Sequence, residues 1–223
     1  MRANDGKSTI NAAYAHVIDQ SVRTYLSFAL SAIVGFLCLV VLMAWYVQDL
    51  TITRWCADCV TMKVPTAGAI MLQSISTCVI VAYWRSERGK GLVIGMMVAT
   101  SVTMILAMTG HVPAFGDDGV KSVCAGMPSV GTALTLFAFV IVDLFYVFKD
   151  RWRAPANTMI MFTTAMSTVA ILGYALDYPP LYWYIPEVST AMSFPTALFC
   201  LSLSVAHFVS HSFKHRRKQF TVW

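Results

Sequence analysis

Cysteines in the loops are the first residues of this chain whose type and spacing suggest chemistry. Cys56 and Cys59 form a C-x-x-C motif, and Cys124 lies in a later loop. In an oxidising compartment, three loop cysteines favour one disulfide and one remaining thiol. A redox-active Cys56–Cys59 pair is an alternative. A zinc site that adds Cys124 and His111 is another, because three thiolates and one imidazole suit zinc.

Ionisable and amide side chains also occur inside apolar segments. Asp143 lies about two turns before a basic turn at Lys149. A carboxylate within a membrane segment is costly and is commonly functional. The alternative is that Asp143 pairs with Lys149 or Arg153 at the membrane interface. Gln73 is a weaker example of the same pattern.

Three histidines, His207, His211 and His215, recur every four residues near the end of the chain. This spacing places imidazoles on one helix face, where they are able to bind a metal or take part in haem ligation. Histidines beside a basic tail are typically interfacial and solvated, and that interpretation is the one we adopt.

Composition indicates the environment in which these groups lie. With 57% hydrophobic and 12% charged residues among 223, the chain is expected to be an integral membrane protein. A helix needs about 20 mainly apolar residues to cross a bilayer. The apolar runs are continuous and do not alternate as barrel strands do. The six expected transmembrane helices are 25–47, 65–84, 91–110, 131–148, 157–176 and 194–212.

A Thr-Ala pair begins every second one of these helices. Thr66, Thr132 and Thr196 are separated by 66 and then 64 residues. Regular spacing of this kind predicts an internal repeat. We therefore expect an all-α integral membrane fold of three helical-hairpin repeats with pseudo-threefold symmetry, at about 25–90, 91–155 and 156–212. Close helix contacts are expected at small residues such as Gly68, Ala69, Gly95, Gly131 and Ala133.

Basic residues predict the orientation. Thirteen of the 16 lysines and arginines fall on one side of this arrangement, and the positive-inside bias then makes both termini cytoplasmic. Residues 1–24 are expected to be a cytoplasmic amphipathic segment, either lying on the membrane or leading into the first helix. The six-helix domain covers 25–212, and 213–223 form a basic cytoplasmic tail. The net charge of +5 therefore reflects topology and does not indicate nucleic-acid binding.

The Thr-Ala starts also predict a place for a ligand. Helix N-termini carry free N–H groups and partial positive charge, so three starts that converge at the outer face favour an anion or a polar headgroup near Thr66, Thr132 and Thr196. The alternative is that these residues only begin helices. Tyr178 and Trp183 belong to an aromatic loop that either lines a pocket or forms part of the interfacial aromatic belt.

The triplicated pattern resembles the six-helix sensory region at the N-terminus of many bacterial histidine kinases and diguanylate cyclases. The resemblance rests on Met62-Thr66-Ala67, Met127-Thr132-Ala133, Met192-Thr196-Ala197 and Leu172-Gly173-Tyr174. In the middle repeat the Met–Thr spacing is one residue longer, and the eleven residues after 212 are too few for a signalling domain, as expected of a detached sensor or of an excised module. The resemblance implies a bacterial inner-membrane protein and a sensory role, without defining a ligand or cofactor.

The sequence thus favours a non-enzymatic sensory or accessory membrane module. It would bind a ligand or partner at its extracytoplasmic face and signal to a cytoplasmic or membrane partner. Its partners would be the lipid bilayer and another protein or a second copy of the chain. One alternative is a membrane thiol oxidoreductase that uses Cys56 and Cys59 with a quinone. Another is a structural subunit of a larger membrane complex.

Overall fold

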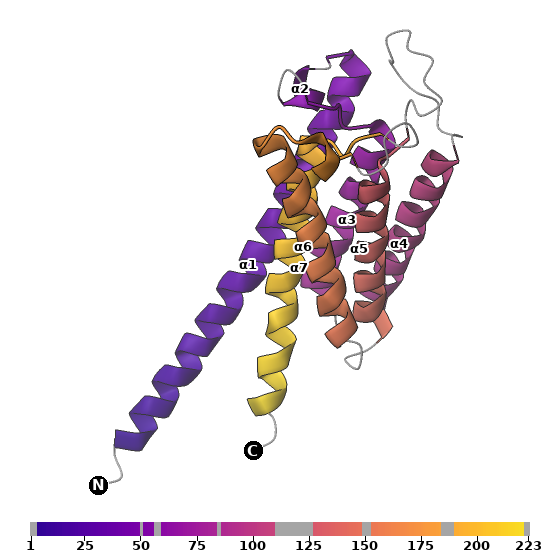
Figure 1. Ribbon diagram of the computed structural model, residues 1–223. Helices are drawn as coiled ribbons and strands as arrows, with labels where there is room; N and C mark the ends of the chain where they lie inside the picture. The colour runs from indigo at the N-terminus through magenta and orange to yellow at the C-terminus, as the bar shows by residue number, and fades with distance from the viewer. Residues whose placement is uncertain are drawn as a thin grey trace.

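The computed structural model describes residues 4–49, 51–55, 59–83, 86–109, 127–148, 153–183 and 190–220, without the side chains of 4–20, 54, 87, 148, 153 and 211–220. These residues are helical and contain no strand (Figure 1). The helices are α1 (Asn4–Val47), α2 (Thr51–Arg54), α3 (Val64–Tyr83), α4 (Glu87–Met108), α5 (Val130–Phe148), α6 (Arg153–Ala175), the short 3₁₀ helix η2 (Pro179–Leu181) and α7 (Phe194–Phe220).

Five of these helices are long and apolar enough to cross a membrane. Their apolar stretches are Ser21–Val47, Val64–Tyr83, Arg88–Met108, Val130–Val147 and Ala154–Ala175. A helix bonds its own backbone polar groups, which allows it to lie in lipid. The sixth expected transmembrane helix corresponds to Phe194–Ser210, a shorter apolar part of α7. The expected helical membrane protein is therefore confirmed, with five long apolar helices in place of six.

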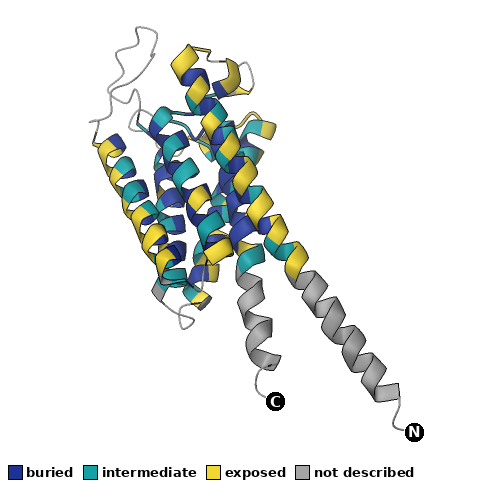
Figure 2. Ribbon diagram, turned by 180° about the vertical axis from the view of Figure 1, so that it is seen from behind, coloured by how far each residue is buried: buried dark blue, intermediate teal, exposed yellow. Residues whose placement is uncertain are grey.

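Alternate helices occupy the centre of the bundle. α3, α5 and α7 contact one another. Each of α1, α4 and α6 contacts two of these three helices. About half of the apolar stretch is buried in α3 (56%) and α5 (50%), against 28% in each of α1, α4 and α6. Figure 2 shows the outer helices with long exposed stripes that face away from the bundle. The three central helices are those that begin with the Thr-Ala pairs.

Buried positions recur along the central helices at intervals of three and four residues. Four residues after the three threonines come Ile70, Leu136 and Cys200, and seven residues after them come Gln73, Phe139 and Leu203; all six are fully buried. Such spacing keeps one face of each helix directed at its neighbours. The pseudo-threefold repeat itself stays a prediction, but these layers agree with it.

Small residues contribute to close packing at some of the expected positions. Ala69 and Ala133 are buried, and a Cβ placed on Gly35 of α1 would lie 3.3 Å from the Ser74 Cβ of α3. Gly68 and Gly95 have open space where a side chain would be. The expectation that these two glycines form close contacts is wrong, because they lie on helix faces that no neighbouring helix approaches.

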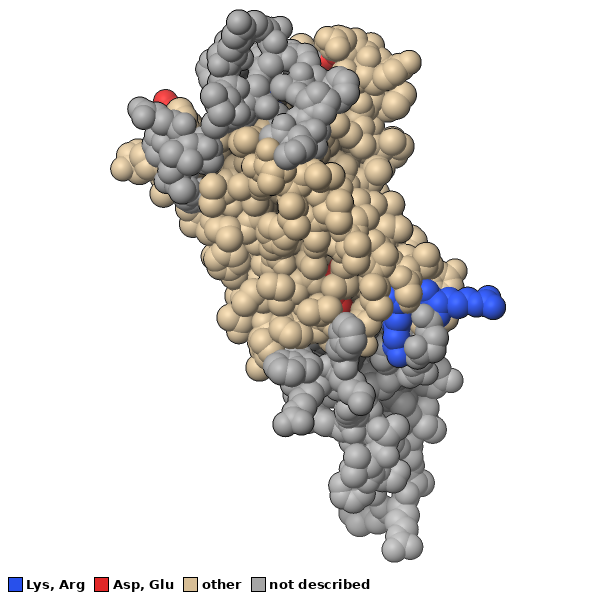
Figure 3. All heavy atoms as spheres, turned by 90° about the vertical axis from the view of Figure 1, so that its right-hand side faces the viewer, with Lys and Arg blue, Asp and Glu red and all other residues tan. Residues whose placement is uncertain are grey.

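The helix ends place the two termini on the same side of the molecule. The first turns of α1 and the last turns of α7 project from the same end of the bundle (Figure 1). On the face seen in Figure 3, the conspicuous lysine and arginine side chains lie toward that end, and few other charged side chains are visible among the described residues. Within the expected amphipathic segment 1–24, residues 4–24 are part of α1; the side chains up to residue 20 lie outside the described residues.

Candidate functional site

The Thr-Ala starts of the central helices are buried, and in α5 and α7 a preceding serine caps the start. Ser129 Oγ accepts a hydrogen bond from the Thr132 backbone N–H at 3.0 Å and lies 2.8 Å from Thr132 Oγ1. Ser193 Oγ lies 2.7 Å from Thr196 Oγ1 and 3.4 Å from its backbone N. A serine in this position satisfies an N–H group that the helix leaves free. Thr66 is 2% exposed.

Removal of a cap should weaken its helix start. We expect Ser129→Ala to lower the free energy of unfolding by about 1 kcal/mol. Reversible unfolding in mixed micelles measures this change. Ser202→Ala is the matched control, because the Ser202 hydroxyl donates to the Leu198 carbonyl within α7 and caps nothing. Equal effects of the two substitutions would contradict the capping role.

The aromatic loop after α6 is packed onto the start of α7. The Tyr174 and Tyr182 rings stack with centroids 4.1 Å apart and an interplanar angle of 9°. The Tyr174 hydroxyl donates to the Met192 carbonyl at 2.8 Å, and the Met192 backbone N–H donates to the Tyr182 carbonyl at 2.8 Å. Tyr178 and Trp183 of the same loop are 55% and 38% exposed, so they are available to a ligand or to lipid.

The cysteines divide between the bundle and the loops. The free cysteines of the described residues are Cys38, Cys78 and Cys200. Cys38 and Cys200 are fully buried as packing residues. Cys59 is 7% exposed and disulfide-bonded, while Cys56 and Cys124 lie outside the described residues. A disulfide-bonded Cys59 does not supply a thiolate to zinc. Which cysteine pairs with Cys59, and whether the bridge is structural or redox-active, stay predictions.

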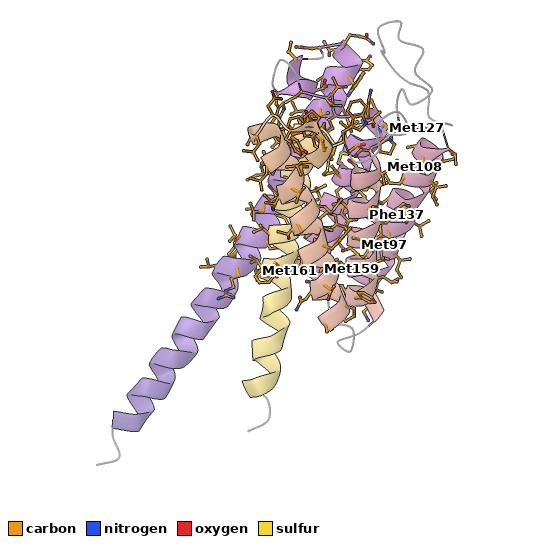
Figure 4. The ribbon with its side chains drawn as sticks, in the orientation of Figure 1. Met97, Met108, Met127, Phe137, Met159 and Met161 are labelled. Atoms are coloured by element: carbon orange, nitrogen blue, oxygen red, sulfur yellow. The ribbon has the colours of Figure 1, made fainter. Side chains whose placement is uncertain are left out.

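Methionines are spread along the bundle and do not converge on a site. Figure 4 shows Met97 and Met108 at different heights of α4, with Phe137 on the neighbouring α5. Met97 is buried, whereas Met108 is 39% exposed. Their positions fit helix packing and contact with lipid.

The most unusual feature of the interior is a carboxylate held by the central helices. Asp143 of α5 is fully buried. Its Oδ2 accepts hydrogen bonds from Gln73 Nε2 and Ser76 Oγ of α3, each at 2.6 Å. Its Oδ1 lies 3.9 Å from His207 Nε2 of α7. We call Gln73, Ser76, Thr77, Asp143 and His207 the axial cluster.

His207 is fully buried, so the expectation of an interfacial, solvated histidine is wrong for this residue. Its Nε2 lies 3.1 Å from Thr77 Oγ1. Its ring stacks on Phe139 with centroids 5.4 Å apart, and the Tyr146 ring lies 6.1 Å away. Apolar packing on α7 and α5 therefore encloses the imidazole. The side chains of His211 and His215 lie outside the described residues.

The sequence holds a signal for this cluster that inspection of single motifs misses. Thr77, Asp143 and His207 each follow the Thr-Ala threonine of their own helix by eleven residues. Eleven residues are about three helical turns, so corresponding positions of three central helices meet at one level. Asp143 was identified as a functional candidate and Gln73 as a weaker one. Ser76 and Thr77 were not identified.

The polar layer continues toward the helix ends on the side of the termini. Tyr146 Oη lies 3.0 Å from Ser210 Oγ and donates to the His207 carbonyl at 3.4 Å. Tyr146 and Ser210 are half-buried. On the opposite side, toward the loop ends, lies the fully buried layer of Ile70, Leu136 and Cys200. Half-buried polar side chains therefore adjoin the cluster on the side of the termini.

Three buried atoms of the cluster have no hydrogen-bond partner among the described residues. They are Gln73 Oε1, Asp143 Oδ1 and His207 Nδ1. Buried polar atoms are normally paired, because an unpaired one costs about 1–3 kcal/mol. An arrangement that tolerates this cost in the bundle centre is a candidate for a function that involves a change of state.

Comparison of the chain with protein-family models, with curated proteins and with solved structures finds no match. The resemblance to six-helix sensory regions therefore stays a prediction that rests on short motifs. The functional interpretation depends on the arrangement of the residues themselves.

Proposed function

We propose that this chain is a non-enzymatic membrane sensory or accessory module whose three central helices change their packing around the axial cluster. The observation that carries the proposal is the Asp143–His207 approach at the contact of α3, α5 and α7. Buried ionisable groups in membrane proteins are costly and mark functional positions. They also hold helices in one register, because each polar group needs its partner.

The aromatic loop offers a physical connection from the outer face to this cluster. The hydrogen bonds and ring stack of Tyr182 and Tyr174 attach the loop to Met192, two residues before α7. α7 carries His207 at its midpoint. A ligand or partner that displaces the exposed Tyr178 or Trp183 would therefore shift α7 relative to α5. A signal requires that the two packings differ in affinity for that ligand.

A side chain at Gly173 should disconnect the loop. A Cβ placed there would lie 2.8 Å from Leu181 Cβ and 2.8 Å from Tyr182 Cδ1, which is too close for either to stay in place. We expect Gly173→Val to separate Tyr182 from Tyr174 and to raise hydrogen–deuterium exchange at the start of α7 by about tenfold. The tenfold figure corresponds to about 1.4 kcal/mol.

The matched control is Gly95→Val, because Gly95 has open space at its Cβ. Exchange at the start of α7 should then be the same as in the wild type. If Gly173→Val leaves that exchange unchanged as well, the loop is not coupled to α7 and the proposed connection is incorrect.

The topology and partner belong to the same proposal. With both termini cytoplasmic, as the basic residues indicate, α1 and α7 would extend on the cytoplasmic side and contact a signalling partner or a second copy. The bacterial inner membrane and the sensory class are supported by the sequence resemblance. In this scheme Thr66, Thr132 and Thr196 set the helix starts, while Tyr178 and Trp183 contact the ligand or partner.

The oxidoreductase alternative depends on the accessibility of the loop cysteines. Thiol exchange requires attack on an accessible sulfur, and Cys59 is 7% exposed. This burial favours a structural role for the disulfide-bonded Cys59 over a role in thiol–disulfide exchange.

The experiment that tests the proposed function is mass spectrometry of the protein purified from its native membrane, with thiol labelling before and after reduction. A bound small molecule together with a cytoplasmic-side partner, whose cross-linking to α1 or α7 changes in Asp143→Asn, is the expected result. A reducible Cys56–Cys59 pair with bound quinone would establish the oxidoreductase instead. Stoichiometric subunits whose cross-links are the same in wild type and Asp143→Asn would make the chain a structural component.

A further inference from the structure

We propose that Asp143 and His207 together bind one exchangeable proton, and that this proton stabilises the packing of the three central helices. This proposal deepens the proposed function, on which its signalling role rests. It assigns a chemical ligand, the hydrogen ion, to the axial cluster. The hydrogen-bond directions, the balance of charge and the surroundings of the two side chains support it.

Hydrogen-bond directions indicate where the His207 proton lies. The Thr77 hydroxyl donates to the Gln73 carbonyl at 2.9 Å. It has only one hydrogen, so at its contact with His207 the hydroxyl oxygen accepts and Nε2–H donates. The same Nε2 lies 3.9 Å from Asp143 Oδ1, which is an acceptor without a hydrogen bond among the described residues. A small rotation of the ring would move the Nε2–H from the threonine to the carboxylate.

The charge balance makes one added proton favourable. A neutral imidazole beside an ionised carboxylate leaves one net negative charge in the bundle centre. A proton taken from water binds either to the ring, which becomes imidazolium, or to the carboxylate, which becomes carboxylic acid. In both cases the pair becomes neutral overall, and water is left with one proton fewer. Buried net charge is expensive, whereas a neutral pair is much less so.

Proton binding on the ring also changes the hydrogen bonding. An imidazolium is attracted by the carboxylate, and a charge-assisted N–H···O contact shortens to about 2.7–2.9 Å. The 3.9 Å separation of Nε2 and Oδ1 would therefore close as α7 and α5 approach each other. Loss of the proton reverses this step and leaves Asp143 bonded only to Gln73 and Ser76 of α3. The proton would thus change the number of helices to which the Asp143 side chain is bonded from one to two.

Other ionisable groups are few in the described parts of the helices packed against this pair. Tyr146 on α5 lies beside His207, and Cys200 on α7 lies two turns earlier. α3 contributes the half-buried Cys78, which contacts the Phe28 carbonyl of α1, and the exposed Tyr83 in its last turn. The ionisable side chains described on the remaining packed helices are Arg88 and Lys90 in the first turn of α4, Tyr174 in the last turn of α6, and Arg23, Tyr25, Cys38 and Tyr46 on α1.

The proton should reach the pair from the side of the termini. The half-buried Tyr146 and Ser210 lie beside His207 on that side: Tyr146 Oη contacts Ser210 Oγ at 3.0 Å and donates to the His207 backbone carbonyl at 3.4 Å. In the other direction lies the fully buried layer of Ile70, Leu136 and Cys200. The cluster would therefore respond to the pH of the compartment that contains the termini.

The test uses the full-length protein in lipid nanodiscs. Infrared difference spectra report carboxyl and imidazole protonation during a pH titration, and the thermal unfolding midpoint Tm reports packing at each pH. For the wild type we expect one buried group that titrates, with a Tm that falls by several degrees as the proton is lost. The sign follows from linkage, because the packed state binds the extra proton and is favoured as pH falls.

Three variants distinguish titration of this pair from titration elsewhere in the chain. Asp143→Asn should abolish both the buried titration and the pH dependence of Tm. His207→Gln should shift the titration midpoint of Asp143 by about one pH unit or more, a tenfold change in proton affinity. Asp177→Asn, which alters an exposed carboxylate in the loop, should leave both signals unchanged.

Several results would overturn the proposal. They are a titration that survives Asp143→Asn, a wild-type Tm with no pH dependence, and a Tm that depends on Na⁺ at constant pH but not on pH, which would identify a metal-cation site. The proposed sensory function is tested separately, by whether the protein has a signalling partner. A protein that titrates as expected but has no partner would contradict the sensory function and leave the proton site in place.

Discussion

Asp143→Leu should lower the free energy of unfolding by about 3 kcal/mol, because removal of one member of a buried polar group leaves the others unpaired. Gln73 Nε2 and Ser76 Oγ would lose their acceptor, and His207 would lose the carboxylate beside it. Each unsatisfied donor costs about 1–3 kcal/mol. Reversible unfolding in mixed micelles gives the free energy directly.

Two further variants distinguish hydrogen bonding from charge and from shape. Asp143→Asn keeps an acceptor for Gln73 and Ser76, so the loss should be about 1 kcal/mol. The combined variant Gln73→Leu, Ser76→Ala, Asp143→Leu, His207→Leu also replaces the polar side chains that Asp143→Leu alone would leave without a partner. Its stability should therefore return close to that of the wild type. If Asp143→Leu alone is as stable as the wild type, the carboxylate does not join the helices.

Phe139→Ala should destabilise the bundle by about 3–5 kcal/mol, the usual range for removal of a buried aromatic ring. Phe139 is fully buried and stacks on His207, with centroids 5.4 Å apart. The cavity would weaken the contact of α5 with α7 and also release the imidazole. The same unfolding measurement tests this expectation.

The control for Phe139 is Leu144 on the same helix. Leu144 is 38% exposed and would face lipid, so Leu144→Ala should change the stability by about 0.5 kcal/mol or less. A similar loss for both variants would mean that α5 does not present Phe139 to the centre of the bundle. A large loss of stability for Phe139→Ala alone would support the structure, in which α5 directs Phe139 to the centre of the bundle and Leu144 away from it.

Much of the fold follows from hydrophobicity and spacing. The long apolar runs predicted membrane helices, and five of them have that length and character in the structure. The Thr-Ala pairs identified the starts of α3, α5 and α7, although Gly68 and Gly95 do not pack as expected. A count of apolar residues says how long a helix is, but it does not say which of its faces meets a neighbour.

The candidate site was only partly predictable for a related reason. Asp143 stood out because a carboxylate is rare in an apolar run, but its expected partners were the nearby Lys149 or Arg153. Its observed hydrogen-bond partners come from α3, 67 and 70 positions earlier in the chain. His207 was assigned to the interface because of its basic neighbours. Only the common offset of eleven residues connects Asp143, Thr77 and His207, and its meaning depends on three helices that pack in register.

The most direct test of the account is a through-space ¹³C–¹⁵N solid-state NMR measurement between the Asp143 carboxyl carbon and the His207 ring nitrogens, with the protein in lipid bilayers. The structure places His207 Nε2 3.9 Å from Asp143 Oδ1, so a correlation between the two side chains is expected, and Asp143→Asn should shift the imidazole nitrogen signals. Absence of the correlation, with both side chains otherwise detected, would show that the central helices do not meet at this cluster and would contradict the account.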